Sequence, residues 1–169
     1  MTQVEALGRD ETWDRDLFLG ELDGINELPD NLRFRSRYFA CLLAWDASEA
    51  SADEIRSVGQ KLIDQGVAYF CLWGPDCERV HDLIDEVEAI REQANPDDES
   101  VIMTSWHHDE PLSEAIWFAL RCALPDDPYI DGCKATLAIS VGCSEWAAQI
   151  RAALNDPKKF SDEHVATNH

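Results

Sequence analysis

The chain has 169 residues, enough for one domain with its own core, and 45% of them are hydrophobic, which argues against an intrinsically disordered protein. Its net charge of −20 argues against direct binding to nucleic acid or to anionic membranes, because these need clustered Lys and Arg. With neither a signal-peptide pattern nor an apolar run of about 20 residues, we expect a soluble, cytoplasmic protein with reduced cysteines and no cofactor.

Residues 1–32 form an acidic segment with scattered apolar side chains. Leu17, Leu22 and Ile25 are compatible with a short helix, but two glycines and a proline interrupt any long one. The segment is therefore predicted to be an arm that docks on the domain.

Four apolar segments follow, separated by amphipathic ones. Their continuous apolar runs are typical of strands covered on both faces, as in a parallel sheet. The predicted strands are residues 38–45, 67–73, 101–106 and 133–141.

A helix signal follows each predicted strand. Ser51 and Glu54 fit a capping box, and Gly66 suits the position just past a helix end. Pro75 and Pro111 suit helix starts. The predicted helices are residues 51–65, 75–94, 111–124 and 144–154.

Strands alternating with helices predict an α/β fold. We expect a three-layer α/β/α sandwich with a mostly parallel sheet of about four to five strands, of the Rossmann-like or flavodoxin-like type. The predicted organisation is an arm at residues 1–32, the α/β domain at residues 33–154 and a flexible tail at residues 155–169, where apolar residues are few.

Tryptophans and acids recur directly after the predicted strands. In open parallel sheets ligands bind beyond the carboxyl ends of the strands, so these residues could form a wall that stacks a planar ligand or a partner side chain. Alternatively, each indole closes one end of the core. The candidate binding residues are Trp45, Asp46, Trp73, Asp76, Trp106, His107, Asp109, Glu110 and Glu145.

Cys77 lies in the first turn of a predicted helix, where the helix dipole favours a thiolate, and His81 lies one turn later. Together with Asp76 these are the candidate catalytic residues, although the surrounding acids oppose thiolate formation. Cys143 has a similar position. The alternative is that both cysteines fill space at tight turns.

His107, His108 and Asp109 are weak candidates for metal ligands. Adjacent side chains point in different directions, so the two histidines cannot both bind one ion unless the loop turns sharply. We therefore expect no metal site, and a solvated acidic loop is the alternative.

The segment W-G-P-D-C-E-R-V-H-D at residues 73–82, together with W-H-H-D-E at residues 106–110, resembles an uncharacterised family of small bacterial proteins. The resemblance covers residues 38–154. It implies bacterial origin and one compact domain, and it carries over no catalytic role.

Binding is expected rather than catalysis. Acids and tryptophans suit an acidic module that binds a basic protein surface, such as an immunity-type inhibitor or an accessory or regulatory subunit of a bacterial toxin or defence system. The alternative is an enzyme or small-molecule sensor in which Asp, His and Cys side chains act at the strand ends, with or without a metal.

Arg33, Arg35 and Arg37 alternate with other residues and would project on one side of an extended segment. The acidic arm could fold across them, or they could support self-association into a homodimer. The alternative is ordinary surface charge before the first strand.

Overall fold

A computed structural model describes residues 4–168. One sheet contains six strands in the order β1-β2-β6-β3-β4-β5, and only β1 runs antiparallel to its neighbour. The strands are β1 (Val4–Asp10), β2 (Arg15–Leu22), β3 (Tyr38–Ala44), β4 (Val67–Trp73), β5 (Met103–Trp106) and β6 (Cys133–Val141).

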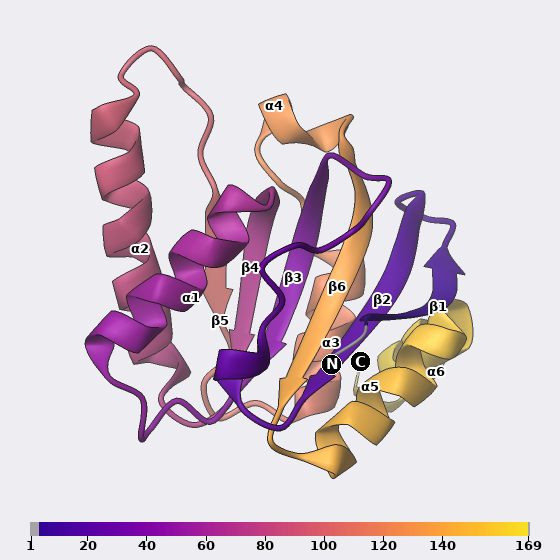
Figure 1. The fold of residues 1–169 in the computed structure, drawn as a ribbon. Coiled ribbons are helices and arrows are strands. Elements are labelled where there is room, and N and C mark those ends of the chain that lie inside the picture. Colours follow the sequence, from indigo (N-terminus) through magenta and orange to yellow (C-terminus); the bar gives the residue numbers. More distant parts are fainter. Residues whose placement is uncertain (1–3, 169) are drawn as a thin grey trace.

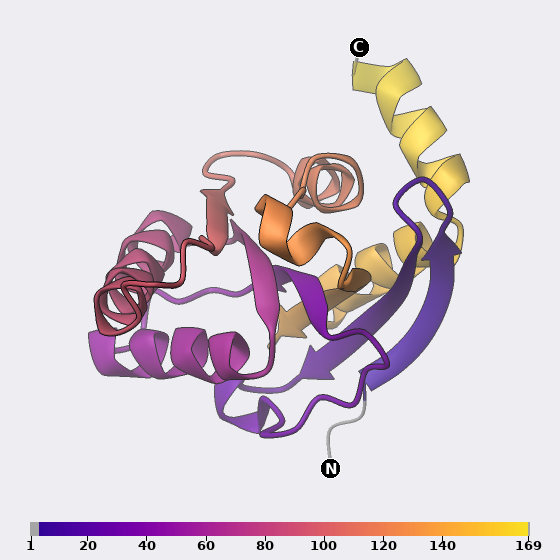
Figure 2. The same ribbon diagram turned by 90° about the horizontal axis from the view of Figure 1, so that it is seen from above.

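Helices cover both faces of the sheet (Figures 1 and 2). The elements are the 3-10 turn η1 (Ile25–Glu27) and the helices α1 (Ala52–Asp64), α2 (Cys77–Ala94), α3 (Leu112–Arg121), α4 (Asp127–Ile130), α5 (Ser144–Asn155) and α6 (Pro157–Asn168). Helices α1 and α2 lie on one face, and α3 and α5 lie on the other. The predicted three-layer α/β sandwich with a mostly parallel sheet is confirmed, with six strands instead of four or five.

The core consists of two apolar clusters, one on each face of the sheet. Successive residues of β3 alternate between the two clusters. Phe39, Cys41 and Leu43 pack with α1 and α2, while Ala40 and Leu42 pack with α3 and α5. This two-sided burial explains the continuous apolar runs of the central strands.

Local signals in the sequence place the first crossover helix. The Ser51 hydroxyl accepts the Glu54 N–H at 3.1 Å, and the Glu54 carboxylate accepts the Ser51 N–H at 3.4 Å, which is the predicted capping box. Gly66 follows the helix with a φ of 107°, where a side chain would collide with the Arg37 carbonyl. Helix α1 therefore starts and stops where its capping residues dictate.

The expected arm is part of the sheet. Residues 4–22 supply β1 and β2, and β2 pairs in parallel with β6, so the expectation of a short helix around Leu17 and Leu22 is wrong. Leu17 and Leu19 are buried on one face of the sheet, while Leu22 is buried on the other. Burial of these side chains outweighs the local acidity.

The expected flexible tail is also wrong. Residues 157–168 form α6, in which Pro157 occupies the first helical position. His164 is buried and its Nε2 lies 2.7 Å from a Glu114 carboxylate oxygen, and the Ser161 hydroxyl accepts from Arg121 at 3.0 Å. These contacts attach α6 to α3.

Within residues 4–168, no helix combines the length and apolarity needed to cross a membrane.

Candidate functional site

The segments that follow β3, β4, β5 and β6 meet at one edge of the sheet, which we call the carboxyl edge. These strands are parallel, and their registers bring Ala44 beside Trp73 and Ser140, and Leu72 beside Trp106. The strand arrowheads point to this edge at the bottom of Figure 1. All nine candidate binding residues lie at the ends of these strands or in the segments that follow them.

The tryptophans of the carboxyl edge do not form one exposed wall, which corrects that expectation. Trp45 is only 6% exposed and belongs to the cluster under α1 and α2. Trp73 packs on the opposite face, edge-on to Trp146 with 5.0 Å between ring centroids, and its indole N–H donates to the Glu110 carbonyl at 2.8 Å. Successive strand residues point to opposite faces, so these indoles close the core instead of forming one surface.

Trp106 differs because it lies at the edge of the sheet. It ends β5, which pairs only with β4, and it is 43% exposed. Its ring packs against the imidazole of His81 on α2, with 4.3 Å between centroids. Trp106 is thus a supported but accessible aromatic side chain.

Carboxylates hold this aromatic pair in place. The His81 ring lies between Asp82 and Asp85, with N···O distances of 3.1 and 3.3 Å. Asp85 also accepts from the Thr104 hydroxyl at 2.8 Å, which links α2 to β5. Because His81 faces these groups, it does not serve Cys77 as the predicted base.

Asp76 has a structural role. It lies in the left-handed region, with a φ of 66°, and accepts from Arg79 Nε at 2.7 Å. Arg79 also donates to the carbonyls of Ala47 and Ala50, so this ion pair fixes the loop after β4 against the loop after β3. Asp46 and Glu145 are exposed, and Asp46 accepts from the backbone and hydroxyl of Ser48.

The proposed thiolate at Cys77 is not favoured by its surroundings. Cys77 is 2% exposed, and burial raises the pKa of its thiol even though the thiol contacts the backbones of Gly74 and His107. Desolvation disfavours the charged form, so it outweighs the helix N-terminus here. Cys143 is half-buried and precedes α5.

We expect iodoacetamide to modify Cys77 much more slowly in the folded protein than in urea, because the thiol is buried and its burial raises its pKa, which lowers the thiolate fraction. As the pH rises, labelling of the folded protein should increase at higher pH than labelling in urea, because the pKa of the folded thiol is raised. Mass spectrometry of the labelled peptides measures both rates. Rapid labelling of folded Cys77 at neutral pH would restore the catalytic interpretation.

His107 forms part of a hydrogen-bonded chain that the sequence analysis missed. It is 5% exposed, its Nδ1 lies 3.0 Å from Glu110 Oε2, and its Nε2 lies 3.1 Å from the Ser105 hydroxyl. Ser105 and His107 are two residues apart at the end of β5. Residues two apart along a strand project to the same face, so this spacing could have predicted that Ser105 and His107 lie side by side.

The metal candidates separate in the structure. His107 faces Ser105 and Glu110, whereas His108 is exposed and contacts Asp109 at 3.1 Å. Over residues 4–168, no group of three or more His, Cys, Asp and Glu side chains has an arrangement that could hold a metal ion. Asp109, which follows the two histidines, has a φ of 57°.

Comparison with known families supplies a classification. Residues 19–161 match the model of a domain of unknown function, DUF7684. The chain belongs to this family. The DUF7684 match begins within β2 and ends within α6, so it covers most of the sheet and the whole carboxyl edge. A search of curated proteins finds no match to this DUF7684 chain.

Proposed function

We propose that the protein is a binding module that docks a basic protein partner on the surface around Trp106. We use the name acidic face for Trp106 at the end of β5, Asp82 and Asp85 on α2, and Asp109 and Glu110 in the loop that follows β5. The observation that carries the proposal is an exposed tryptophan on an edge strand, whose ring packs on the imidazole of His81, which in turn lies between the carboxylates of Asp82 and Asp85.

The charge on the acidic face is not neutralised by arginine or lysine. Elsewhere some arginines contact two carboxylates each, as Arg56 does with Asp53 and Glu86, and Arg151 with Glu5 and Glu21. Among the described residues, no Lys or Arg forms an ion pair with the four acids of the acidic face. Such a surface accelerates encounter with a positively charged partner and repels acidic ones.

Exposed apolar side chains are also present at the edge of the sheet where α2 packs against β5. Large hydrophobic side chains are exposed on α2 and along the segment of β5, namely Ile90, Val101, Met103 and Trp106. An aromatic anchor with apolar neighbours and a charged surround has the composition of an interface centre and its rim.

The biological setting proposed for this module is an immunity-type inhibitor or an accessory subunit of a bacterial toxin or defence system. A net charge of −20 suits inhibition of a basic effector. The six cysteines are free thiols, which supports a reducing compartment such as the cytoplasm.

Affinity capture from native extract tests the proposal, with the wild-type chain, Trp106→Ala and Trp13→Ala as baits. Trp13 lies in the turn between β1 and β2, at the opposite end of the sheet, so it is the matched control. We expect a stoichiometric, basic partner with the wild type and Trp13→Ala, reduced by salt and lost with Trp106→Ala. Capture that survives Trp106→Ala would contradict the proposed face.

Hydrolysis is the second candidate function, favoured by the chain Ser105–His107–Glu110. A serine hydroxyl, an imidazole and a carboxylate in this order can activate the serine as a nucleophile. Alternatively, the hydrogen bonds among these three residues only stabilise the end of β5, where Ser105 pairs with Cys71 of β4. A fluorophosphonate probe distinguishes the catalytic role from the structural one. Labelling of the wild type that is lost in Ser105→Ala supports catalysis. Absence of labelling in the wild type would mean that the hydrogen bonds among Ser105, His107 and Glu110 are structural.

A further inference from the structure

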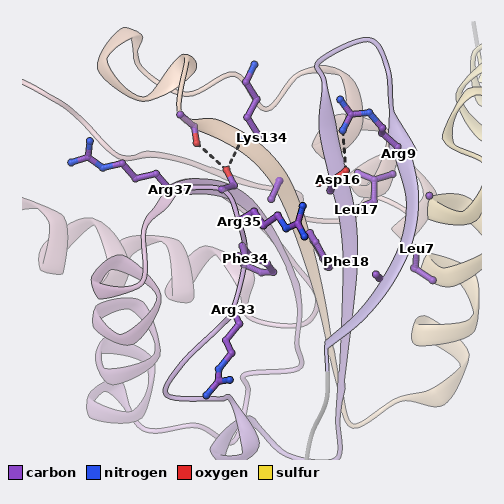
Figure 3. A pocket seen from close by; sticks show the side chains of 15 residues that line it. Leu7, Arg9, Asp16, Leu17, Phe18, Arg33, Phe34, Arg35, Arg37 and Lys134 are labelled. Carbon is purple, nitrogen blue, oxygen red and sulfur yellow. Dashed lines mark hydrogen bonds and ion pairs between the residues drawn. The ribbon is translucent and has the colours of Figure 1, made fainter.

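A cavity of about 720 Å³ lies at the end of the sheet opposite the carboxyl edge. Its walls come from β1, from the start of β2, from residues 33–37 before β3, and from the start of β6. Figure 3 shows these segments around it. The volume falls within the range of about 300–1,000 Å³ that is typical of small-molecule sites.

The charge of this cavity is opposite to that of the whole protein. Five of the chain's 14 Lys and Arg residues line it, against a single carboxylate, Asp16. They are Arg9, Arg33, Arg35, Arg37 and Lys134. We call it the cationic cavity.

Three of these cations have no carboxylate partner. Arg9 contacts Asp14 and Asp16, and Lys134 lies 3.4 Å from Asp14, so one end of the cavity is partly neutralised. Within residues 4–168, Arg33, Arg35 and Arg37 form no ion pair. The predicted arm faces these arginines as the wall formed by β1 and β2, but among the described residues its acids form no ion pair with them, which corrects the expected acidic cover.

The floor of the cationic cavity is aromatic. The rings of Phe18 and Phe34 pack with 4.8 Å between centroids, and Phe34 also packs against Phe39 of the core. Figure 3 shows Arg35 near Phe18 in the middle of the cavity, whereas Arg37 points away from it. A second hollow of about 270 Å³ shares Phe18, Arg33 and Phe34 with the first.

We propose that the cationic cavity binds an amphipathic organic anion. Its carboxylate, phosphate or sulfonate group contacts Arg35, because a guanidinium binds such groups through paired N–H donors. Arg33 and Lys134 add positive potential at either side, and the apolar part of the ligand lies against Phe18 and Phe34. This site is independent of the acidic face, which lies at the other end of the sheet.

Charge and shape together select this ligand class. An inorganic anion would leave the aromatic floor uncovered, and a neutral apolar ligand would leave the unpaired arginines unused. Since the remaining surface carries most of the 34 acidic residues, an anion would be repelled elsewhere and drawn to this cavity.

Titration with the fluorescent anion 1-anilinonaphthalene-8-sulfonate tests the proposal, because the probe combines a sulfonate with aromatic rings. We expect one bound probe per folded chain, displaced by decanoate but not by the decyltrimethylammonium cation. Arg35→Gln should weaken binding about tenfold, the usual effect of removing a charge-assisted hydrogen bond. Lys159→Gln, which removes an exposed charge on α6, is the matched control.

The competing outcomes are distinct. Equal displacement by the cation, or unchanged affinity in Arg35→Gln with an unchanged melting temperature, would reduce the site to an apolar patch and overturn the proposal. Displacement by polyglutamate but not by decanoate would assign the cavity to an acidic peptide and would also overturn it. Absence of probe binding to the folded wild type would do the same.

Discussion

Replacing Trp106 with alanine is expected to weaken the captured complex at least about 30-fold, the loss typical of a tryptophan at the centre of an interface. The side chain is 43% exposed in the free protein, and its ring contact is with His81, so a partner can bury most of the remaining surface. The melting temperature should change little, because the indole contributes little to the core. Isothermal titration of the purified partner measures the affinity.

Two controls separate anchoring from general damage. Trp13→Ala removes a tryptophan at the other end of the sheet and should leave the affinity within about twofold of the wild type. Asp82→Asn should slow association and weaken its salt dependence while changing dissociation little, as expected of a charge at an interface rim. Equal affinity of the wild type and Trp106→Ala would remove Trp106 as the anchor.

The largest effect on stability is expected for Gly74→Ala, a loss of about 3 kcal/mol or more from combined backbone strain and loop displacement. Gly74 has a φ of 121°, and an added Cβ would lie 2.3 Å from the Trp45 carbonyl oxygen. Relieving the clash separates the loops after β3 and β4. It thereby threatens the hydrogen bonds from Trp45 N–H to Trp73 and from Ala47 N–H to Pro75.

Gly20→Ala is the matched control for this substitution. Gly20 lies in β2, and its nearest neighbour to an added Cβ is Val4 Cγ2 at 4.0 Å, so the methyl group fits. We expect a change between zero and about 1 kcal/mol of stabilisation, because alanine restricts the unfolded chain. Urea unfolding of both variants gives the comparison. Similar stabilities for Gly74→Ala and Gly20→Ala would show that the Gly74 turn relaxes at no cost.

The sequence predicts the central strands well because burial on both faces leaves long apolar runs, as in β3 and β4. It does not predict β2, whose burial alternates and whose pairing partner β6 lies more than a hundred residues away. Helix α6 is missed for a related reason, since its buried side chains include the polar Ser161 and His164. Nonlocal packing decides both elements.

The candidate site also combines features that the sequence predicts with features that it does not. Parallel pairing alone predicts that residues following the strands share one edge, and they do. Side-chain direction could not be predicted in the loops: His81 faces Asp82, Asp85 and Trp106 instead of Cys77. The cationic cavity combines a predicted feature, the alternating arginines, with a wall supplied by the unpredicted strands β1 and β2.

Hydrogen–deuterium exchange of the protein, alone and with its captured partner, tests most directly whether the acidic face is the binding surface. We predict slower exchange in the complex at residues 81–86 and 103–110, with no change in the hairpin of β1 and β2. Protection confined to β1, β2 or α6, with residues 103–110 exchanging as in the free protein, would contradict the assignment.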